Sequence, residues 1–113
     1  MTLVFKICTA ADWALAEATG HYAGSEDDAR DGFIHLSAPH QLEGTLHRHY
    51  DGEEGLVLVA FEDGALADLR WEPSRGGDLF PHVYGVLPAE GALWYHGLPV
   101  IDGKHVLPRE LEL

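Results

Sequence analysis

Residues Leu56–Phe61 read Leu-Val-Leu-Val-Ala-Phe, and this apolar run limits the possible folds more than any other segment of the chain. It is shorter than a typical helix and rich in β-branched and aromatic residues, so it predicts a strand over Leu56–Glu62. Because neither face of this strand is polar, the strand is suited to the middle of a sheet, with neighbours on both sides.

The first twenty residues predict a strand followed by a capped helix. Thr2–Cys8 is rich in Val, Phe and Ile, which favours a strand. Thr9 then has the character of an N-cap residue, with Asp12 in a capping-box-like position three residues later. Gly20 ends this helix, because glycine readily adopts the left-handed conformation found at helix C-termini.

A polar loop and a second helix are predicted next. The segment Gly24–Gly32 is polar and predicts a loop, and Phe33–Leu36 predicts a short strand. Ser37 is the expected N-cap of a helix over His40–Tyr50, with Pro39 in its first turn.

The remainder of the chain predicts strands and turns. We expect strands at Leu66–Trp71 and Val83–Leu87, a loop over Pro73–Pro81, and a late hairpin of Leu93–His96 with His105–Leu107. Two early helices and strands throughout give the α+β class. A length of 113 residues, 46% of them hydrophobic, predicts a single domain over residues 1–113.

Charge and cysteine content exclude several classes of function. The chain has 19 acidic residues against 7 Lys plus Arg, a formal net charge of -12, which disfavours binding to nucleic acids or to an anionic membrane. Cys8 is the only cysteine, so an internal disulfide is impossible, and its apolar setting predicts a buried thiol rather than a nucleophile. The chain opens without a signal peptide or membrane span, and we expect a cytoplasmic location.

The first cluster of candidate functional residues is the segment Gly32–Ser37, which reads Gly-Phe-Ile-His-Leu-Ser. His35 lies where a predicted strand ends and a predicted helix begins. Its imidazole, the hydroxyl of Ser37 and the N–H groups of the helix N-terminus together suit a polar or anionic ligand. The alternative is that His35 hydrogen-bonds a loop carbonyl and Ser37 only caps the helix.

The second cluster covers Leu69–Tyr84 and is dense in side chains that bind ligands. Arg70 and Arg75 offer planar donors for phosphate or carboxylate, and Gly76 with Gly77 allows a close backbone approach. The cluster also contains Trp71, Glu72, Phe80, His82 and Tyr84. The alternative is a surface ion pair of Arg70 with Glu72 beside an ordinary loop.

Eight histidines raise the question of a metal site. The sequence contains neither a His-Glu-x-x-His motif nor a Cys-x-x-Cys pair, and His47 and His49 are two residues apart, which places them on different sides of a helix. We therefore expect no metal.

These blocks resemble a known family. Phe5-Lys6-Ile7, Gly32–Ser37 and the block Leu69–Gly85, which reads Leu-Arg-Trp-Glu-Pro-Ser-Arg-Gly-Gly-Asp-Leu-Phe-Pro-His-Val-Tyr-Gly, are similar to the hallmarks of the small bacterial domain-of-unknown-function family 952. The similarity spans about residues 3–108. That family is grouped with the ADP-ribosyltransferase superfamily, nearest the RNA 2′-phosphotransferases.

The resemblance implies a split pair of small, bent sheets with a pocket between them. His35, Leu36 and Ser37 match part of the superfamily's His-x-His-Leu-Ser block, which helps to hold NAD. Lys6 stands where the superfamily has a histidine, and Thr9 replaces its threonine. The histidine is thus lost, and the acidic surface disfavours an RNA substrate.

The leading hypothesis is an ADP-ribosyltransferase-like domain that binds NAD, or another small molecule that contains ADP-ribose. His35 and Ser37 then contact a ribose or phosphate, and the two arginines hold the pyrophosphate. Glu72 stabilises a ribosyl cation or orients an acceptor hydroxyl, with His35 and His82 as further catalytic candidates. The candidates for stacking on a ring are Trp71, Phe80 and Tyr84.

Two other hypotheses remain open at this stage. A non-catalytic module that senses a nucleotide or small anion fits the replacement of histidine by Lys6. An acidic protein-interaction domain fits the net charge but leaves the Leu69–Tyr84 cluster unexplained.

Overall fold

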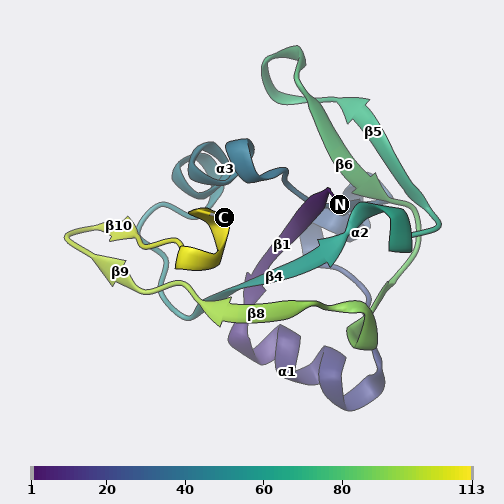
Figure 1. The fold of residues 1–113 in the computed structure, drawn as a ribbon, viewed down its shortest axis with the longest axis horizontal. Helices are drawn as coiled ribbons and strands as arrows, with labels where there is room; N and C mark the ends of the chain where they lie inside the picture. The colour runs from purple at the N-terminus through teal and green to yellow at the C-terminus, as the bar shows by residue number, and fades with distance from the viewer. Residues whose placement is uncertain (1, 113) are drawn as a thin grey trace.

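The computed structural model describes residues 2–112 and is a mixed α+β fold of small antiparallel sheets (Figure 1). The elements are β1 (Leu3–Thr9), α1 (Ala10–Thr19), β2 (His21–Tyr22), α2 (Glu26–Asp31), β3 (Ile34–His35), α3 (Leu42–His49), β4 (Leu56–Glu62), β5 (Leu69–Pro73), β6 (Leu79–Val83), β7 (Leu87–Pro88), β8 (Trp94–Gly97), β9 (Val100–Ile101) and β10 (Lys104–His105).

The apolar strand β4 is the middle strand of the sheet β1–β4–β8, and its bounds confirm the prediction. Helix α1 covers one face of this sheet, where Trp13 packs with Val59 and Phe61. Helix α3 covers the other face, where Leu42 and Leu46 pack with Leu58. The central strands are therefore buried on both sides, as their composition requires.

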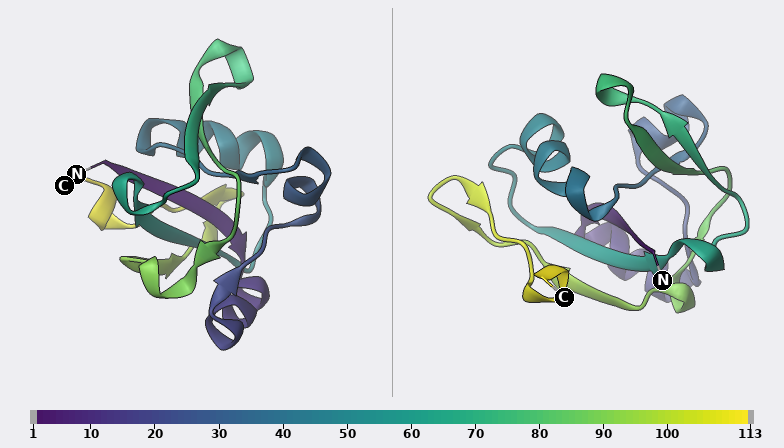
Figure 2. Two further views of the ribbon diagram at one scale, coloured as in Figure 1. Left: turned by 90° about the vertical axis from the view of Figure 1, so that its right-hand side faces the viewer. Right: turned by 45° about the horizontal axis from the view of Figure 1, so that its top comes forward.

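A second sheet contains β3, β6 and β5 in that order. In both views of Figure 2, the hairpin of β5 and β6 projects away from the sheet β1–β4–β8. The two sheets join where Phe5 forms a bridge with Ser37: the Phe5 N–H donates to Ser37 O at 2.8 Å, and the Ser37 N–H donates to Phe5 O at 2.9 Å.

The cap of α1 is confirmed, but the predicted loop Gly24–Gly32 is wrong. Thr9 Oγ1 accepts from the Asp12 N–H at 3.1 Å, and Gly20 is left-handed. Residues Glu26–Asp31 form α2. Its start is a capping box, in which Ser25 Oγ accepts from the Asp28 N–H and Asp28 Oδ2 accepts from the Ser25 N–H.

Ser37 does not cap a helix, which corrects a further prediction. The turn Pro39–Gln41 precedes α3, and Ala38 is its N-cap residue. The backbone of Ser37 is instead paired with Phe5, and its hydroxyl lies 3.0 Å from Thr45 Oγ1. The serine is therefore part of the junction between the sheets.

The segment Pro73–Pro81 is largely a hairpin, where a loop was predicted. β5 and β6 pair from Leu69 with Val83 to Pro73 with Leu79, and a 3-10 turn at Arg75–Gly77 connects them. Pro81 lies inside the central strand β6, where its carbonyl accepts from the Leu36 N–H at 3.0 Å. Proline lacks an N–H and usually avoids such positions, and this is why the strand was missed.

Candidate functional site

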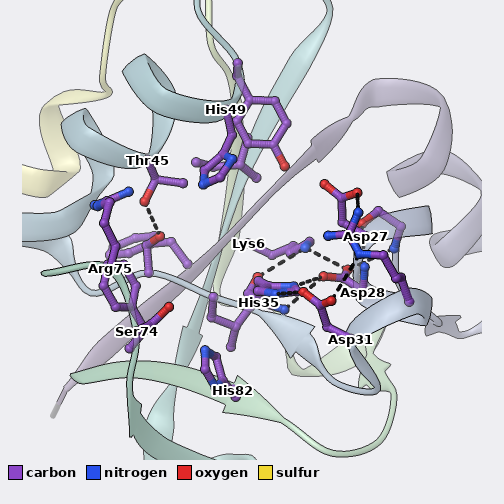
Figure 3. A pocket seen from close by; sticks show the side chains of 18 residues that line it. Lys6, Asp27, Asp28, Asp31, His35, Thr45, His49, Ser74, Arg75 and His82 are labelled. Carbon is purple, nitrogen blue, oxygen red and sulfur yellow. Dashed lines mark hydrogen bonds and ion pairs between the residues drawn. The ribbon is translucent and has the colours of Figure 1, made fainter. Parts of the chain in front are cut away.

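A cavity of about 270 Å³ lies where the two sheets meet. Its walls come from β1, α2, β3, α3 and the hairpin of β5 and β6. Figure 3 shows Arg75, Ser74 and Thr45 on one side of it and three aspartates, Asp27, Asp28 and Asp31, on the other. Segments far apart in the sequence thus build one polar hollow.

Lys6 and Asp28 form a buried ion pair in the wall of the cavity. Lys6 Nζ lies 2.8 Å from Asp28 Oδ2, and the two side chains are only 3% and 2% exposed. Lys6 Nζ also donates to His35 O at 3.1 Å. Both partners are needed, because either charge alone is costly to bury.

Asp28 collects donors from three segments. Oδ2 accepts from Lys6 Nζ and the Ser25 N–H, and Oδ1 accepts from the His35 N–H at 3.0 Å and lies 2.6 Å from His35 Nδ1. Burial acts to raise the pKa of Asp28, but the hydrogen bond from His35 and the Lys6 charge outweigh it and lower the pKa below 3.8. Asp28 therefore stays ionised and fixes the positions of Lys6 and His35.

His35 lies between two carboxylates. Its Nδ1 faces Asp28, and its Nε2 lies 2.9 Å from Asp31 Oδ2. A hydrogen bond from Arg30 is the main cause that lowers the pKa of Asp31. Since both ring nitrogens of His35 are engaged, a ligand reaches one of them only if Asp31 moves.

Arg75 is the cation on the opposite side of the cavity. Its guanidinium lies over the Phe80 ring, 4.9 Å from the ring centroid. It also lies against Gly44 of α3, where an added Cβ would come within 2.9 Å of Nη2. Among the carboxylates whose side chains the structure describes, none forms an ion pair with Arg75.

Polar groups of α3 surround this guanidinium. Thr45 shares a hydrogen bond with Ser37, and His49 lines the cavity near Arg75. Burial, followed by the charges of Arg75 and Arg48, lowers the pKa of His49. This end of the cavity therefore offers hydroxyls, an imidazole and an unpaired positive charge.

His82 enters the cavity from β6 and is held from behind by Glu72. His82 Nδ1 lies 2.8 Å from Glu72 Oε1, and the Tyr84 hydroxyl donates to the same oxygen at 2.8 Å. These two hydrogen bonds, with that of His82 the larger cause, lower the pKa of Glu72. Phe33 stacks on the His82 ring with centroids 4.0 Å apart, and His35 lies beside it at 5.7 Å.

Six of the residues predicted from the sequence line this cavity: Lys6, His35, Ser37, Arg75, Phe80 and His82. Five others do not line it. Thr9 caps α1, and Trp71 packs against the core because it faces away from Arg70 on β5. Arg70 lies over the Tyr84 ring at 5.0 Å, and Glu72 supports His82 from outside.

The sequence did not predict the acidic side of the cavity, formed by Asp27, Asp28 and Asp31, or the two α3 residues that line it, Thr45 and His49. Because Gly24–Gly32 was predicted to be a loop, its aspartates were not among the candidate residues, although the spacing of Ser25 and Asp28 is that of a capping box. Thr45 and His49 face the cavity four residues apart on one side of α3, a spacing that the sequence shows.

The described part of the chain contains neither a metal-binding cluster nor a membrane-spanning helix. Among the side chains that the structure describes, no three of His, Cys, Asp or Glu are grouped so that they would hold a metal ion. None of the helices within residues 2–112 has the length and apolar character needed to cross a bilayer.

Comparisons with known proteins give one family and one solved relative. A family described as "Protein of unknown function (DUF952)" matches residues 7–95. The crystal structure of protein CC0527 from Caulobacter crescentus is 42% identical, with a TM-score of 0.94 over 99% of this chain and 100% of that chain. The solution structure of CC0527 is 40% identical, with a TM-score of 0.82 over 93% of this chain and 91% of that chain. No curated protein matches significantly.

Proposed function

Because the chain belongs to the family described as "Protein of unknown function (DUF952)", and because its polar cavity contains an unpaired arginine, we propose that it is an ADP-ribosyltransferase-like domain that binds NAD, ADP-ribose or a related nucleotide. The cavity between the two sheets is the binding site. The phosphate lies at the Arg75 end, and the sugar extends toward the opposite wall.

The observation that carries this proposal is that Arg75 lacks a described carboxylate partner. The chain has 19 acidic residues, yet none of those described forms an ion pair with this guanidinium. A planar guanidinium beside the hydroxyls of Ser37 and Thr45 offers the donors that a phosphate accepts. An anionic ligand would provide the missing partner.

The volume and polarity of the cavity narrow the ligand class. A volume of about 270 Å³ is just below the roughly 300–1,000 Å³ of typical small-molecule sites. The cavity therefore suits a group no larger than a mononucleotide, and the other half of a dinucleotide would extend outside it. The wall opposite Arg75 contains Asp27 and Asp31, whose oxygens accept hydrogen bonds from sugar hydroxyls. A ribose phosphate matches both ends.

A second candidate is a non-catalytic module that binds the same ligand. Two observations favour it. Lys6, which replaces a superfamily histidine, is tied to Asp28 and buried. Glu72, the candidate for stabilising a ribosyl cation, lies outside the cavity lining and is engaged by His82 and Tyr84.

Calorimetry with NAD, ADP-ribose and AMP tests the proposal. The wild type is expected to bind at least one of them. Arg75→Gln is expected to lose roughly tenfold to a hundredfold in affinity, because a charge-assisted hydrogen bond is removed. The matched control is Arg48→Gln on α3, which removes the same charge from an exposed residue outside the cavity lining and is expected to change affinity less than twofold.

An assay of nicotinamide release then separates the two candidates. Release from NAD supports the transferase, and binding without release supports the sensing module. Absence of binding by all three compounds, or equal losses in the Arg75 and Arg48 variants, contradicts the proposed site.

A further inference from the structure

We infer that His82 binds a sugar hydroxyl of the ligand through Nε2 and that Glu72 is its positioning residue, an assignment that rests on the proposed function. In this assignment Glu72 positions His82 and does not stabilise a ribosyl cation. His82 is the residue that distinguishes a ribose from a sugar that lacks the hydroxyl groups.

The first step is the burial and direction of His82. The side chain is only 6% exposed, yet it is part of the cavity lining, and Figure 3 shows its ring directed into the hollow. The stacked Phe33 ring restricts rotation from one side. A buried ring held in this way presents a fixed edge to a ligand.

The second step is the proton on Nδ1. Glu72 is ionised at neutral pH, because its pKa is lowered by the hydrogen bonds from His82 and Tyr84. An ionised carboxylate only accepts, so His82 Nδ1 must carry the hydrogen in their 2.8 Å contact. We take the ring as the neutral imidazole, in which Nε2 is then a bare acceptor.

The third step is that Nε2 has no partner. No hydrogen bond or ion pair joins His82 Nε2 to another described residue. Among the described side chains, the polar atoms that lack a partner and are also sealed from solvent are Trp13 Nε1 and Tyr22 Oη, and His82 Nε2 is not one of them. Nε2 is therefore accessible from the cavity. This contrasts with His35, both of whose nitrogens face carboxylates.

The fourth step is the chemistry of the ligand group. Nε2 as an acceptor requires a donor, and a phosphate at neutral pH has few hydrogens to donate, whereas a ribose hydroxyl donates readily. Arg75 presents only donors and takes the phosphate. The two residues thus bind the two parts of a ribose phosphate with opposite hydrogen-bonding roles.

The experiment removes the hydroxyls from the ligand, which needs no variant that might fail to fold. AMP and 2′,3′-dideoxy-AMP are titrated into the full chain by calorimetry. The wild type is expected to bind AMP about tenfold more tightly, the value of roughly one buried hydrogen bond. In His82→Gln this preference is expected to fall below threefold. His47→Gln, the control at an exposed position of α3 outside the cavity lining, is expected to keep it.

A second measurement follows the proton directly. Long-range ¹H–¹⁵N spectra of the labelled chain are expected to show His82 as the neutral Nδ1–H form, with the Nε2 signal moving when AMP is added. In Glu72→Ala the ring is expected to lose this preference, whereas the exposed control Glu90→Ala leaves it unchanged.

The outcomes separate the two proposals. Equal binding of AMP and 2′,3′-dideoxy-AMP by the wild type overturns the role of His82 and leaves the proposed cavity in place. A doubly protonated or Nε2–H ring in the free protein at neutral pH also overturns it. If neither nucleotide binds, both proposals fail.

Discussion

Replacing Asp28 by Asn is expected to destabilise the protein more than any other single loss of charge. The four donors from Lys6, Ser25 and His35 surround both carboxylate oxygens. An amide keeps one oxygen and turns an NH₂ group toward two of these donors, whichever way it is oriented. The variant therefore loses two hydrogen bonds and leaves the Lys6 charge buried without a counterion.

The magnitude follows from that geometry. Removing one partner of a buried ion pair costs roughly 3–5 kcal/mol in the free energy of unfolding. For a chain of 113 residues this corresponds to a fall in Tm on the order of 10–20 °C. Asp27→Asn is the matched control: its side chain is 67% exposed and pairs only with exposed Arg30, so we expect a change below about 0.5 kcal/mol.

Urea unfolding followed by circular dichroism measures the free energy of unfolding of both variants. A double-mutant cycle with Lys6→Met measures the coupling between Lys6 and Asp28. In the Lys6→Met background the Asn substitution is expected to cost at least about 1 kcal/mol less, because no cation is then left unpaired. A loss below about 1 kcal/mol for Asp28→Asn in the wild-type background, or strictly additive effects, would refute this account of the cavity wall.

The ion pair of Lys6 and Asp28 also predicts how the stability of the fold depends on pH. The pKa of Asp28 is below 3.8 in the folded state, so its contribution is present above the pKa of the unfolded chain and is lost as pH falls further. The wild type should therefore lose its stability advantage over Asp28→Asn between about pH 5 and pH 2. An advantage that persists to pH 2 would contradict the assignment.

Three further predictions concern the body of the fold. Burial raises the pKa of the Cys8 thiol to about 12, so at pH 8 it should react with a disulfide reagent only after unfolding, as the absorbance of the released thiol would report; rapid reaction of the native protein would contradict the burial. Gly24→Ala should cost roughly 1–3 kcal/mol in urea unfolding, because Gly24 has a φ of +109° and an added Cβ would lie 2.9 Å from Asp28 Cβ; Gly52→Ala, with a positive φ but open space around it, is the control and should cost less. Leu58→Ala should cost about 2–5 kcal/mol by the same measurement, since Leu58 is fully buried in β4, and a value near that of a surface substitution would contradict its place in the core.

The sequence predicted those elements whose signals are local. The apolar composition of β4 placed it correctly in the middle of a sheet, and Thr9 with Gly20 marked both ends of α1. The helix α2 was missed because five of its six residues are charged and the sixth is Ala29, so no hydrophobic period distinguishes it from a loop. Strand β6 was missed because Pro81 is unusual in a central strand.

The candidate site was predictable as a set of residues but not as an arrangement. His35 and His82 were singled out, and they lie opposite each other as a register pair of β3 and β6. The exclusion of Glu72 and Trp71 from the cavity lining depends on how the second sheet is placed against the first, which no local pattern encodes. Likewise, the pairing of Lys6 with Asp28 joins residues 22 positions apart.

The absence of a side chain at Gly44 has a consequence that reaches beyond its own helix. A methyl group there would meet the mobile end of Arg75, which can swing aside, while alanine favours the helix over glycine by about 1 kcal/mol. Gly44→Ala should therefore leave the protein as stable as before, or more stable, and yet turn the Arg75 guanidinium away from the proposed phosphate position. If Arg75 binds the ligand as proposed, stability and recognition are separable at this position, and a relative with a larger residue here would need another cation to take the place of Arg75.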